Sequence, residues 1–267
     1  MASTTGTTAG TVSAETIERY RRDGFIKIPG VISREEAAAF REAALDAADR
    51  LRALNRTAQG RAAAVFDQFV NVWQRDERMR ALTLHPNVGA VAERLAGVPL
   101  RLWHDHILIK QPQQSAPTEF HQDQPYWPHA GAQHALSAWI ALGDVPPERG
   151  CMTFIPGSST RTDLAAQDLT DAEDLFRKSP DLAWEPRVTV PLRAGDCTFH
   201  HSRCAHMALA NTTMEARVAH VVIFMDAAAT YTGARHPVTD PLSIEPGRPL
   251  DHEAFPLVGA DSAIGRQ

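Results

Sequence analysis

The stretch Arg217-Val-Ala-His-Val-Val-Ile-Phe224 has the clearest strand pattern in this chain of 267 residues. Successive side chains of a β-strand point to opposite faces, so one face carries Arg217, Ala219, Val221 and Ile223. Because this face is apolar apart from Arg217, we expect it to point into a barrel. The stretch therefore predicts a β-core with a guanidinium inside it.

Other short segments from residue 100 onward have the same character. They are rich in β-branched and aromatic residues, and turn signals such as Gly143-Asp144 and Pro156-Gly157 separate them. The expected strands are residues 100–110, 135–142, 152–155, 187–190 and 196–200, followed by 217–224. This spacing favours a sandwich or jelly roll over alternating β-α-β units.

Helices are expected to flank this β-core. Ser33 and Glu36 form a capping box before an apolar stripe of helical period, which predicts a long helix. Shorter helices are indicated by cap residues on either side of it, and the insert after residue 162 also has helical character. The expected helices are residues 13–22, 33–54, 86–95 and 162–179. The fold class is thus mainly β with flanking helices (α+β).

The length of the chain favours one domain. Residues 1–12 are small and polar and should form a disordered tail, which leaves a single domain over 13–267. Its β-core should span about residues 98–226, and the proline-rich segment 229–267 should form a loop that wraps or lids the core.

Charge and hydropathy indicate a cytoplasmic protein that binds neither nucleic acid nor membrane. The net charge of −5 leaves no basic footprint for nucleic acid, and no apolar run is long enough to span a membrane. The first residues also lack the pattern of a signal peptide. The sequence leaves the oligomeric state open.

The motif Phe120-His-Gln-Asp-Gln-Pro-Tyr-Trp-Pro128 carries candidate metal ligands. His121 and Asp123 are two residues apart, so on a strand they point to the same side and can converge on one ion. A facial triad for ferrous iron needs a second histidine and leaves the opposite side open. The candidates in the distal half are His200, His201, His206 and His220, and each alone is more often a structural residue than a ligand.

Arg217 supplies a separate clue, because a buried guanidinium needs an anion. A dicarboxylate could meet it with two parallel hydrogen bonds and chelate a metal through its other end. A structural acid such as Glu215 or Asp226 could serve equally well. The sequence alone leaves these two alternatives open.

Several ordered motifs resemble the phytanoyl-CoA dioxygenase family of iron(II)/2-oxoglutarate oxygenases. The resemblance covers residues 20–225 and rests on the whole set, since H-x-D alone is common. The motifs are Lys110-Gln-Pro, His121-Gln-Asp-Gln-Pro-Tyr-Trp-Pro, Ala138-Trp-Ile-Ala-Leu-Gly-Asp-Val, Gly150-Cys-Met-Thr-Phe-Ile-Pro-Gly-Ser, Gly195-Asp-Cys-Thr-Phe-His-His, His206, and Arg217 eleven residues after it.

The resemblance implies a double-stranded β-helix, which is a cupin-like jelly roll. It implies that His121, Asp123 and His206 bind iron and that Arg217 binds 2-oxoglutarate. Trp139, Gln122 and His106 match positions that line the co-substrate pocket, although Trp139 could equally be core and His106 could simply bond across the sheet.

The implied reaction consumes 2-oxoglutarate and O2 at Fe(II), releases succinate and CO2, and hydroxylates an unactivated C–H bond. Desaturation, epoxidation and ring rearrangement share its first step. The carboxylate of Asp123 disfavours halogenation, since related halogenases have a small residue there. Ala208 departs from the family, which usually has a hydroxyl residue at this position to help hold the co-substrate, so either another residue supplies the donor or the co-substrate binds more weakly.

The substrate is expected to be a free small organic molecule, possibly a secondary-metabolite intermediate. Candidate substrate contacts are Tyr126, Trp127, Phe69 and Trp73. The sequence shows no convincing basic patch for the phosphates of coenzyme A. Two alternatives stay open: a non-catalytic β-barrel binding module, and a non-redox metalloenzyme, such as an isomerase or hydrolase, on the same fold.

Overall fold

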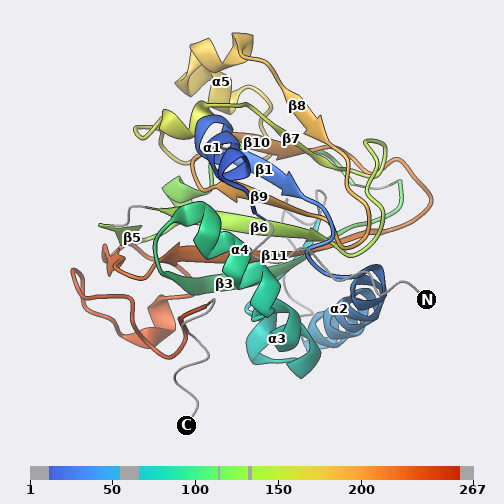
Figure 1. Cartoon of the computed structure of the whole chain (residues 1–267), viewed down its shortest axis with the longest axis horizontal. Helices are drawn as coiled ribbons and strands as arrows, with labels where there is room; N and C mark the ends of the chain where they lie inside the picture. The colour runs from blue at the N-terminus through green and yellow to red at the C-terminus, as the bar shows by residue number, and fades with distance from the viewer. Residues whose placement is uncertain (1–11, 55–65, 114, 132–133, 259–267) are drawn as a thin grey trace.

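The computed structural model describes residues 12–54, 66–113, 115–131 and 134–258 (Figure 1). The N-terminal part is mostly helical and carries two strands that join the β-core. Its elements are α1 (Ala14–Asp23), β1 (Phe25–Ile28), α2 (Arg34–Leu54), β2 (Asp67–Val70), η3 (Val72–Gln74), α3 (Glu77–Thr83) and α4 (Pro86–Ala96).

Two antiparallel sheets form the core. The larger sheet has the strand order β1-β9-β6-β11-β3-β2, and the smaller has the order β4-β10-β7-β8. From β3 to β11, successive core strands switch between the two sheets except at β7 and β8, which are neighbours in the smaller sheet; this is the connectivity of a double-stranded β-helix. The strands are β3 (Leu100–Lys110), β4 (Thr118–His121), β6 (Ala135–Ala141), β7 (Met152–Phe154), β8 (Val188–Val190), β9 (Cys197–His201), β10 (His206–Ala208) and β11 (Arg217–Asp226).

The local signals at the helix ends act as expected. Ser13 caps α1 by accepting a hydrogen bond from the Thr16 backbone N–H at 3.1 Å, and Gly24 ends that helix in the left-handed region. Ser33 and Glu36 form the capping box reciprocally, because each side chain accepts the backbone N–H of the other residue, at 3.0 and 2.7 Å. These caps position α1 and α2 against the barrel.

The helices cover the outer face of the larger sheet, as Figure 1 shows for α3 and α4. One apolar core fills the space between α2, α3, α4 and this sheet, and a second core lies between the two sheets. The tail expected over residues 1–12 lies outside the described residues except for Val12, which is 5% exposed and packs in the first core. Val12 therefore belongs to the folded part of the chain.

The helix expected over residues 162–179 is wrong for most of that range. The described residues of the insert form one short helix, α5 (Asp174–Lys178), and a 3-10 turn, η6 (Pro180–Trp184), with irregular chain before them. Acidic side chains satisfy backbone N–H groups here instead of i to i−4 bonds: Asp168 accepts from Thr170, and Asp171 accepts from Glu173. Such local bonds compete with helix formation.

The C-terminal segment packs along the barrel. It contains β12 (Thr230–Tyr231), which pairs with β5 (His129–Ala130), and the 3-10 turn η7 (Asp240–Leu242). Phe255 stacks on Trp103 with ring centroids 5.1 Å apart, and the Leu102 backbone N–H donates to the Pro256 carbonyl at 2.9 Å. Among the described helices, none is long and apolar enough to cross a membrane.

Candidate metal centre and co-substrate cavity

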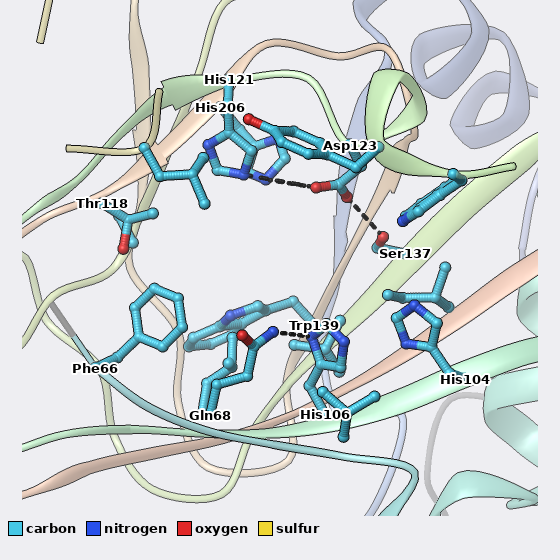
Figure 2. A pocket seen from close by; sticks show the side chains of 18 of the residues that line it. Phe66, Gln68, His104, His106, Thr118, His121, Asp123, Ser137, Trp139 and His206 are labelled. Carbon is cyan, nitrogen blue, oxygen red and sulfur yellow. Dashed lines mark hydrogen bonds and ion pairs between the residues drawn. The ribbon is translucent and has the colours of Figure 1, made fainter. Parts of the chain in front are cut away.

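Three expected ligands converge at the end of the smaller sheet. His121 ends β4 and His206 begins β10, and the two residues are direct partners across this antiparallel strand pair. Asp123 follows β4, with its Oδ1 3.5 Å from His121 Nε2 and 3.8 Å from His206 Nε2. Within the described residues, this is the one cluster of histidine, cysteine and acidic side chains able to hold a metal ion (Figure 2).

Hydrogen bonds orient both imidazoles for metal binding. His121 Nδ1 donates to the Glu119 carbonyl at 2.8 Å, and His206 Nδ1 donates to the Cys204 carbonyl at 2.9 Å. A neutral ring that donates through Nδ1 keeps its lone pair on Nε2, the atom that faces Asp123. Burial, followed by the nearby His121, lowers the pKa of His206 to about 3, so this ring stays neutral near pH 7.

Asp123 is fixed by contacts behind the cluster. Ser137, on β6, donates its hydroxyl to Asp123 Oδ2 at 3.0 Å, and His200 Nε2 lies 3.7 Å from the same oxygen. Oδ1 is thereby left to face the two histidines. Burial opposes ionisation of Asp123, but the neighbouring imidazoles of His206, His121 and His200 hold its pKa well below the usual value.

The structure separates His206 from the three competing histidines. His200 lies behind Asp123 and lines the cavity. His201 points elsewhere and packs edge-on against His134. His220 lies on the opposite face of β11, under the helices, where its Nε2 is 2.9 Å from the Thr83 hydroxyl. Of these four histidines, His206 is the one that clusters with His121 and Asp123.

Arg217 lies in the same cavity as the cluster, with its side chain 2% exposed. The cavity has a volume of about 340 Å³. Arg217 donates to the Gly150 carbonyl at 3.3 Å, its guanidinium carbon lies 5.2 Å from the centre of the Trp139 ring, and its Nε has no partner. Among the described residues, no carboxylate forms an ion pair with it; Glu215 instead pairs with Arg149.

The surroundings of Arg217 fit an anionic ligand. Burial lowers the pKa of Arg217 from its usual value, as expected for a guanidinium that lacks a counterion. Lys110, its direct partner on β3, is also buried; burial first and Arg217 second lower its pKa to about 7. Gly150 has a φ of +82°, and a Cβ there would lie 2.7 Å from the Leu209 carbonyl, so only glycine fits beside this pocket.

Thr118 is a candidate for the donor that replaces the hydroxyl absent at Ala208. The two residues are direct partners across β4 and β10, and both line the cavity that holds Arg217. The Thr118 hydroxyl forms no hydrogen bond with the described residues, so it is available to a ligand. Thr118 directly precedes Glu119 and lies three residues before His121, so in a regular strand it would point to the face opposite His121. The register shift between β4 and β10 brings it to the cavity, and no sequence pattern predicts that irregularity.

The remaining expected site residues divide into two groups. Trp139, His106, Tyr126 and Trp127 line the cavity, whereas Gln122, Phe69 and Trp73 do not. Phe69 and Trp73 pack on the helix side of the larger sheet. Their neighbours Gln68 and Val70, on β2, face the cavity instead. β2 is not among the strands expected from the sequence, so its alternation gave no guide to which side chains face the cavity.

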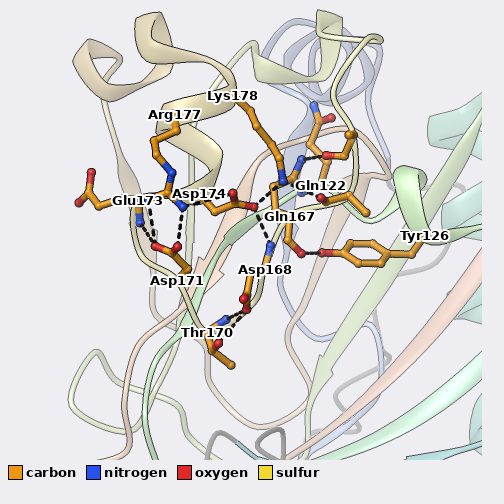
Figure 3. Close-up of polar contacts among 12 residues, drawn as sticks. Gln122, Tyr126, Gln167, Asp168, Thr170, Asp171, Glu173, Asp174, Arg177 and Lys178 are labelled. Atoms are coloured by element: carbon orange, nitrogen blue, oxygen red, sulfur yellow. Dashed lines mark hydrogen bonds and ion pairs between the residues drawn. The ribbon is translucent and has the colours of Figure 1, made fainter.

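Gln122 has a structural position. Its side-chain amide donates to the carbonyls of Arg203 at 2.6 Å and Arg161 at 3.2 Å, and its backbone N–H donates to Gln167 Oε1 at 2.8 Å. Figure 3 shows that Gln167 also accepts the Tyr126 hydroxyl through its backbone carbonyl. These contacts tie the insert to the metal-binding turn and direct Gln122 away from the cavity.

Comparison with known proteins identifies the family. The profile of the phytanoyl-CoA dioxygenase (PhyH) family matches residues 20–219. The chain is 29% identical over 160 residues to phytanoyl-CoA dioxygenase domain-containing protein 1 of Mus musculus, covering 58% of this chain and 55% of that protein. It is 28% identical over 150 residues to L-proline trans-4-hydroxylase of Streptomyces griseoviridis, covering 52% and 53%. The chain thus spans about half the length of these curated relatives.

Two solved structures match more of the chain. SnoK, a non-heme alpha ketoglutarate dependent carbocyclase from nogalamycin biosynthesis, is 41% identical, with a TM-score of 0.84 over 95% of this chain and 99% of that one. The epimerase SnoN, solved with Fe3+, alpha ketoglutarate and nogalamycin RO, is 40% identical, with a TM-score of 0.74 over 90% and 96%.

The fold and the H-x-D…H cluster define a non-haem, iron- and 2-oxoglutarate-dependent class of enzyme. This chain belongs to the phytanoyl-CoA dioxygenase (PhyH) family. The expected double-stranded β-helix is confirmed.

Proposed function

We propose that this protein uses Fe(II), 2-oxoglutarate and O2 to oxidise an unactivated C–H bond of a small, uncharged organic molecule, by hydroxylation in the first instance. One observation carries the proposal: a three-residue metal cluster and a buried arginine without a counterion share one cavity. A metal alone would explain the cluster, and a structural acid would explain the arginine. Only a chelating dianion accounts for both.

His121, Asp123 and His206 would hold the metal through two Nε2 atoms and one carboxylate oxygen, leaving the side toward the cavity for other ligands. Ser137 holds Asp123 in the ligating orientation. Arg217, assisted by Thr118, would bind the distal carboxylate of 2-oxoglutarate. When bound, ferrous iron with 2-oxoglutarate and O2 supplies the oxidant and releases succinate and CO2.

The cavity favours an uncharged substrate. Its described lining contains two charged side chains, Asp123 and Arg217, and both have roles in the metal and co-substrate sites. The rest is uncharged: apart from the neutral polar groups of Gln68, Thr118 and Ser137 it is apolar, aromatic or imidazole, as at Phe66 and Val238. A zwitterionic amino acid or a phosphate group would lose its hydration here without gaining a charged partner. Tyr126 contributes its ring, since its hydroxyl already donates to Gln167.

Ring closure or epimerisation is a second candidate outcome. The observation that favours it is the 40–41% identity to SnoK and SnoN, a carbocyclase and an epimerase, over nine-tenths or more of the chain. Both outcomes can begin with removal of a hydrogen atom from carbon, which the cavity would control by positioning the substrate. The relatives also support a secondary metabolite as the substrate.

The first test measures succinate formed from 2-oxoglutarate without an organic substrate. We expect slow formation that requires Fe(II) and O2 and is lost in His206→Gln, while His252→Gln, outside the cavity, keeps it. Succinate formed equally by His206→Gln would contradict the assignment. A binding module would bind ligands but consume no O2, and a non-redox metalloenzyme would turn over a substrate anaerobically with a redox-inert metal.

Labelled oxygen separates the two candidate outcomes once a substrate is found by screening. With 18O2, hydroxylation places label in both succinate and the organic product. Ring closure or epimerisation places one labelled atom in succinate and releases the other as water; epimerisation also takes two electrons from an added reductant, because its product is at the oxidation level of the substrate. Label in the product would therefore favour hydroxylation, and an unlabelled, isomeric or dehydrogenated product would favour the second candidate.

A further inference from the structure

Three imidazole rings line the cavity away from the metal cluster and lie nearly parallel. His104 is the central ring: its centroid is 4.5 Å from that of His106, with the planes 18° apart, and 5.9 Å from that of His236, with the planes 19° apart. His104 and His106 come from the inner face of β3, and His236 comes from the C-terminal segment. Figure 2 shows His104 and His106 across the cavity from His121 and His206.

Hydrogen bonds fix where two of these rings carry their protons. The side-chain NH2 of Gln68 donates to His106 Nδ1 at 3.0 Å, and the Val238 backbone N–H donates to His236 Nδ1 at 3.2 Å. A ring that accepts through Nδ1 carries its proton on Nε2 when neutral. His106 and His236 therefore each offer an Nε2–H donor, and neither donor has a partner among the described residues.

The three rings are uncharged near neutral pH. Burial, followed by the neighbouring rings, lowers the pKa of His104 well below its usual value. Burial also lowers the pKa of His106 to about 4 and lowers that of His236. No acidic side chain among the described residues bonds to any of them. These rings are neutral hydrogen-bonding groups in a largely apolar wall. They are not part of the metal-binding cluster found among the described residues.

Unpartnered polar atoms at such a site indicate a ligand with matching groups. A buried donor or acceptor left without a partner costs about 1–3 kcal/mol. His104 has no hydrogen bond to the described residues, and its Nδ1 is fully buried. The rings of Trp127 and His104 are nearly perpendicular, with centroids 6.5 Å apart, so an aromatic side chain borders the imidazole rings. Neutral oxygen groups beside an apolar ring system would satisfy both surfaces.

We propose that His104, His106 and His236 form the recognition subsite for the organic substrate and bind hydroxyl or carbonyl oxygens of an uncharged, oxygenated ring compound. This inference rests on the proposed function, since it takes the cavity to be the substrate site. The Nε2–H groups of His106 and His236 donate to substrate oxygens, and His104 serves as donor or acceptor according to its tautomer. The subsite selects oxygenated rings over plain hydrocarbon rings of the same shape.

Equilibrium binding to the metal-free protein tests the proposal without turnover. The probes are a naphthalenediol and naphthalene, which share a ring system and differ in hydroxyl groups. We expect the wild-type protein to bind the diol about ten-fold more tightly, which corresponds to about 1.4 kcal/mol. His106→Phe and His236→Phe should reduce this preference to about two-fold or less and leave naphthalene affinity unchanged, because phenylalanine keeps the ring shape and loses the nitrogen atoms.

His252→Phe is the matched control. His252 Nδ1 also accepts the backbone N–H of the residue two positions later, at 3.0 Å, but His252 does not line the cavity. The control should keep the preference for the diol. Equal affinity of the wild-type protein for both probes, or an undiminished preference in both His variants, would overturn the proposal.

A parallel assay distinguishes rejection of the recognition subsite from rejection of the proposed oxygenase function. Iron-dependent succinate formation by the wild-type protein, measured in parallel, reports on the oxygenase assignment alone. Succinate formation with no diol preference would reject the recognition subsite and keep the oxygenase. His104→Phe provides a second check, because its melting temperature and its affinity for 2-oxoglutarate show whether the fold and the co-substrate site remain intact.

Discussion

Both faces of β3 carry buried polar side chains, but the two faces differ in whether those side chains have hydrogen-bond partners. On the outer face, under the helices, the Asp105 carboxylate accepts the Trp73 backbone N–H at 3.0 Å, and the Thr83 hydroxyl lies 3.0 Å from Asp105 and 2.9 Å from His220. His104 directly precedes Asp105 and points to the inner face, where it has no hydrogen bond to the described residues. Arg217, on the adjacent strand, likewise has no carboxylate partner there.

The difference separates structural polar groups from ligand-binding ones. The outer groups mainly bond to each other, although Asp105 Oδ1 and His220 Nδ1 have no partner of their own. The inner groups face a cavity and share its polar space with the metal cluster. We therefore expect outer-face substitutions to change the free energy of unfolding and inner-face substitutions to change ligand affinity.

The largest expected effect is at Arg217. Arg217→Met should weaken 2-oxoglutarate binding on the order of 100-fold, because it removes a buried charged partner of the ligand. It should not lower the free energy of unfolding of the ligand-free protein, since a buried charge without a counterion is itself unfavourable. Isothermal titration and urea denaturation measure the two quantities.

Arg149→Met is the control for this comparison, because Arg149 already pairs with Glu215 at 3.1 Å. It should leave 2-oxoglutarate affinity unchanged. Strong destabilisation of the ligand-free protein by Arg217→Met, with unchanged 2-oxoglutarate affinity, would show that Arg217 has a structural partner instead.

Thr83→Val tests the outer face. The substitution keeps the side-chain volume but removes the hydroxyl between Asp105 and His220, so the free energy of unfolding should fall by about 2 kcal/mol. Affinity for 2-oxoglutarate should stay within about two-fold of wild type. Urea denaturation and titration check both values; loss of co-substrate affinity with unchanged stability would reverse the assignment of the two faces.

Asp105 gives the outer face a pH dependence. Burial raises the pKa of Asp105 to about 7, so the folded protein retains this proton over a pH range in which the unfolded chain has lost it. The contribution to stability therefore falls as the pH rises from about 4 to about 7. Asp105→Asn should remove up to about 1.4 kcal/mol per pH unit from the slope of unfolding free energy in this window. An unchanged slope would show that Asp105 ionises normally.

The smallest expected effect concerns Thr118. Thr118→Val should weaken 2-oxoglutarate binding about five- to ten-fold, which corresponds to loss of about one hydrogen bond. Adding Ala208→Ser should restore much of the affinity, because it returns a hydroxyl from the neighbouring strand. Thr153→Val, whose hydroxyl lies 2.9 Å from that of Thr189, is the control. Unchanged 2-oxoglutarate affinity in Thr118→Val would show that the Thr118 hydroxyl does not take part in binding.

Strand patterns and motif order predicted much of the β-core and the convergence of the cluster. The alternation over residues 217–224 correctly placed Arg217 inside, and β3 has the expected bounds. Sequence could not decide whether Arg217 had a structural acid, because that depends on which side chains the fold brings near it. The partner of Glu215, which is Arg149, is distant in sequence.

The misses have physical causes as well. Phe69 is a substrate candidate by sequence because an aromatic side chain suggests a substrate wall, but alternation along β2 turns Phe69 toward the helices and Gln68 toward the cavity. Gln122 lies beside two ligands in sequence, yet the turn after β4 directs its amide to backbone carbonyls of distant loops. The stacked imidazole rings join β3 to the C-terminal segment, and no local pattern signals that contact.

The central claim is that the metal cluster and Arg217 hold iron and 2-oxoglutarate together in one cavity. Anaerobic addition of Fe(II) and 2-oxoglutarate, followed by visible absorption, tests it most directly, because the charge-transfer band forms only when 2-oxoglutarate chelates the iron. We predict the band in the wild-type protein and in Thr83→Val, its absence in His206→Gln, and a much higher 2-oxoglutarate requirement in Arg217→Met. No band in the wild-type protein, with Fe(II) and 2-oxoglutarate both shown to be bound, would contradict the account.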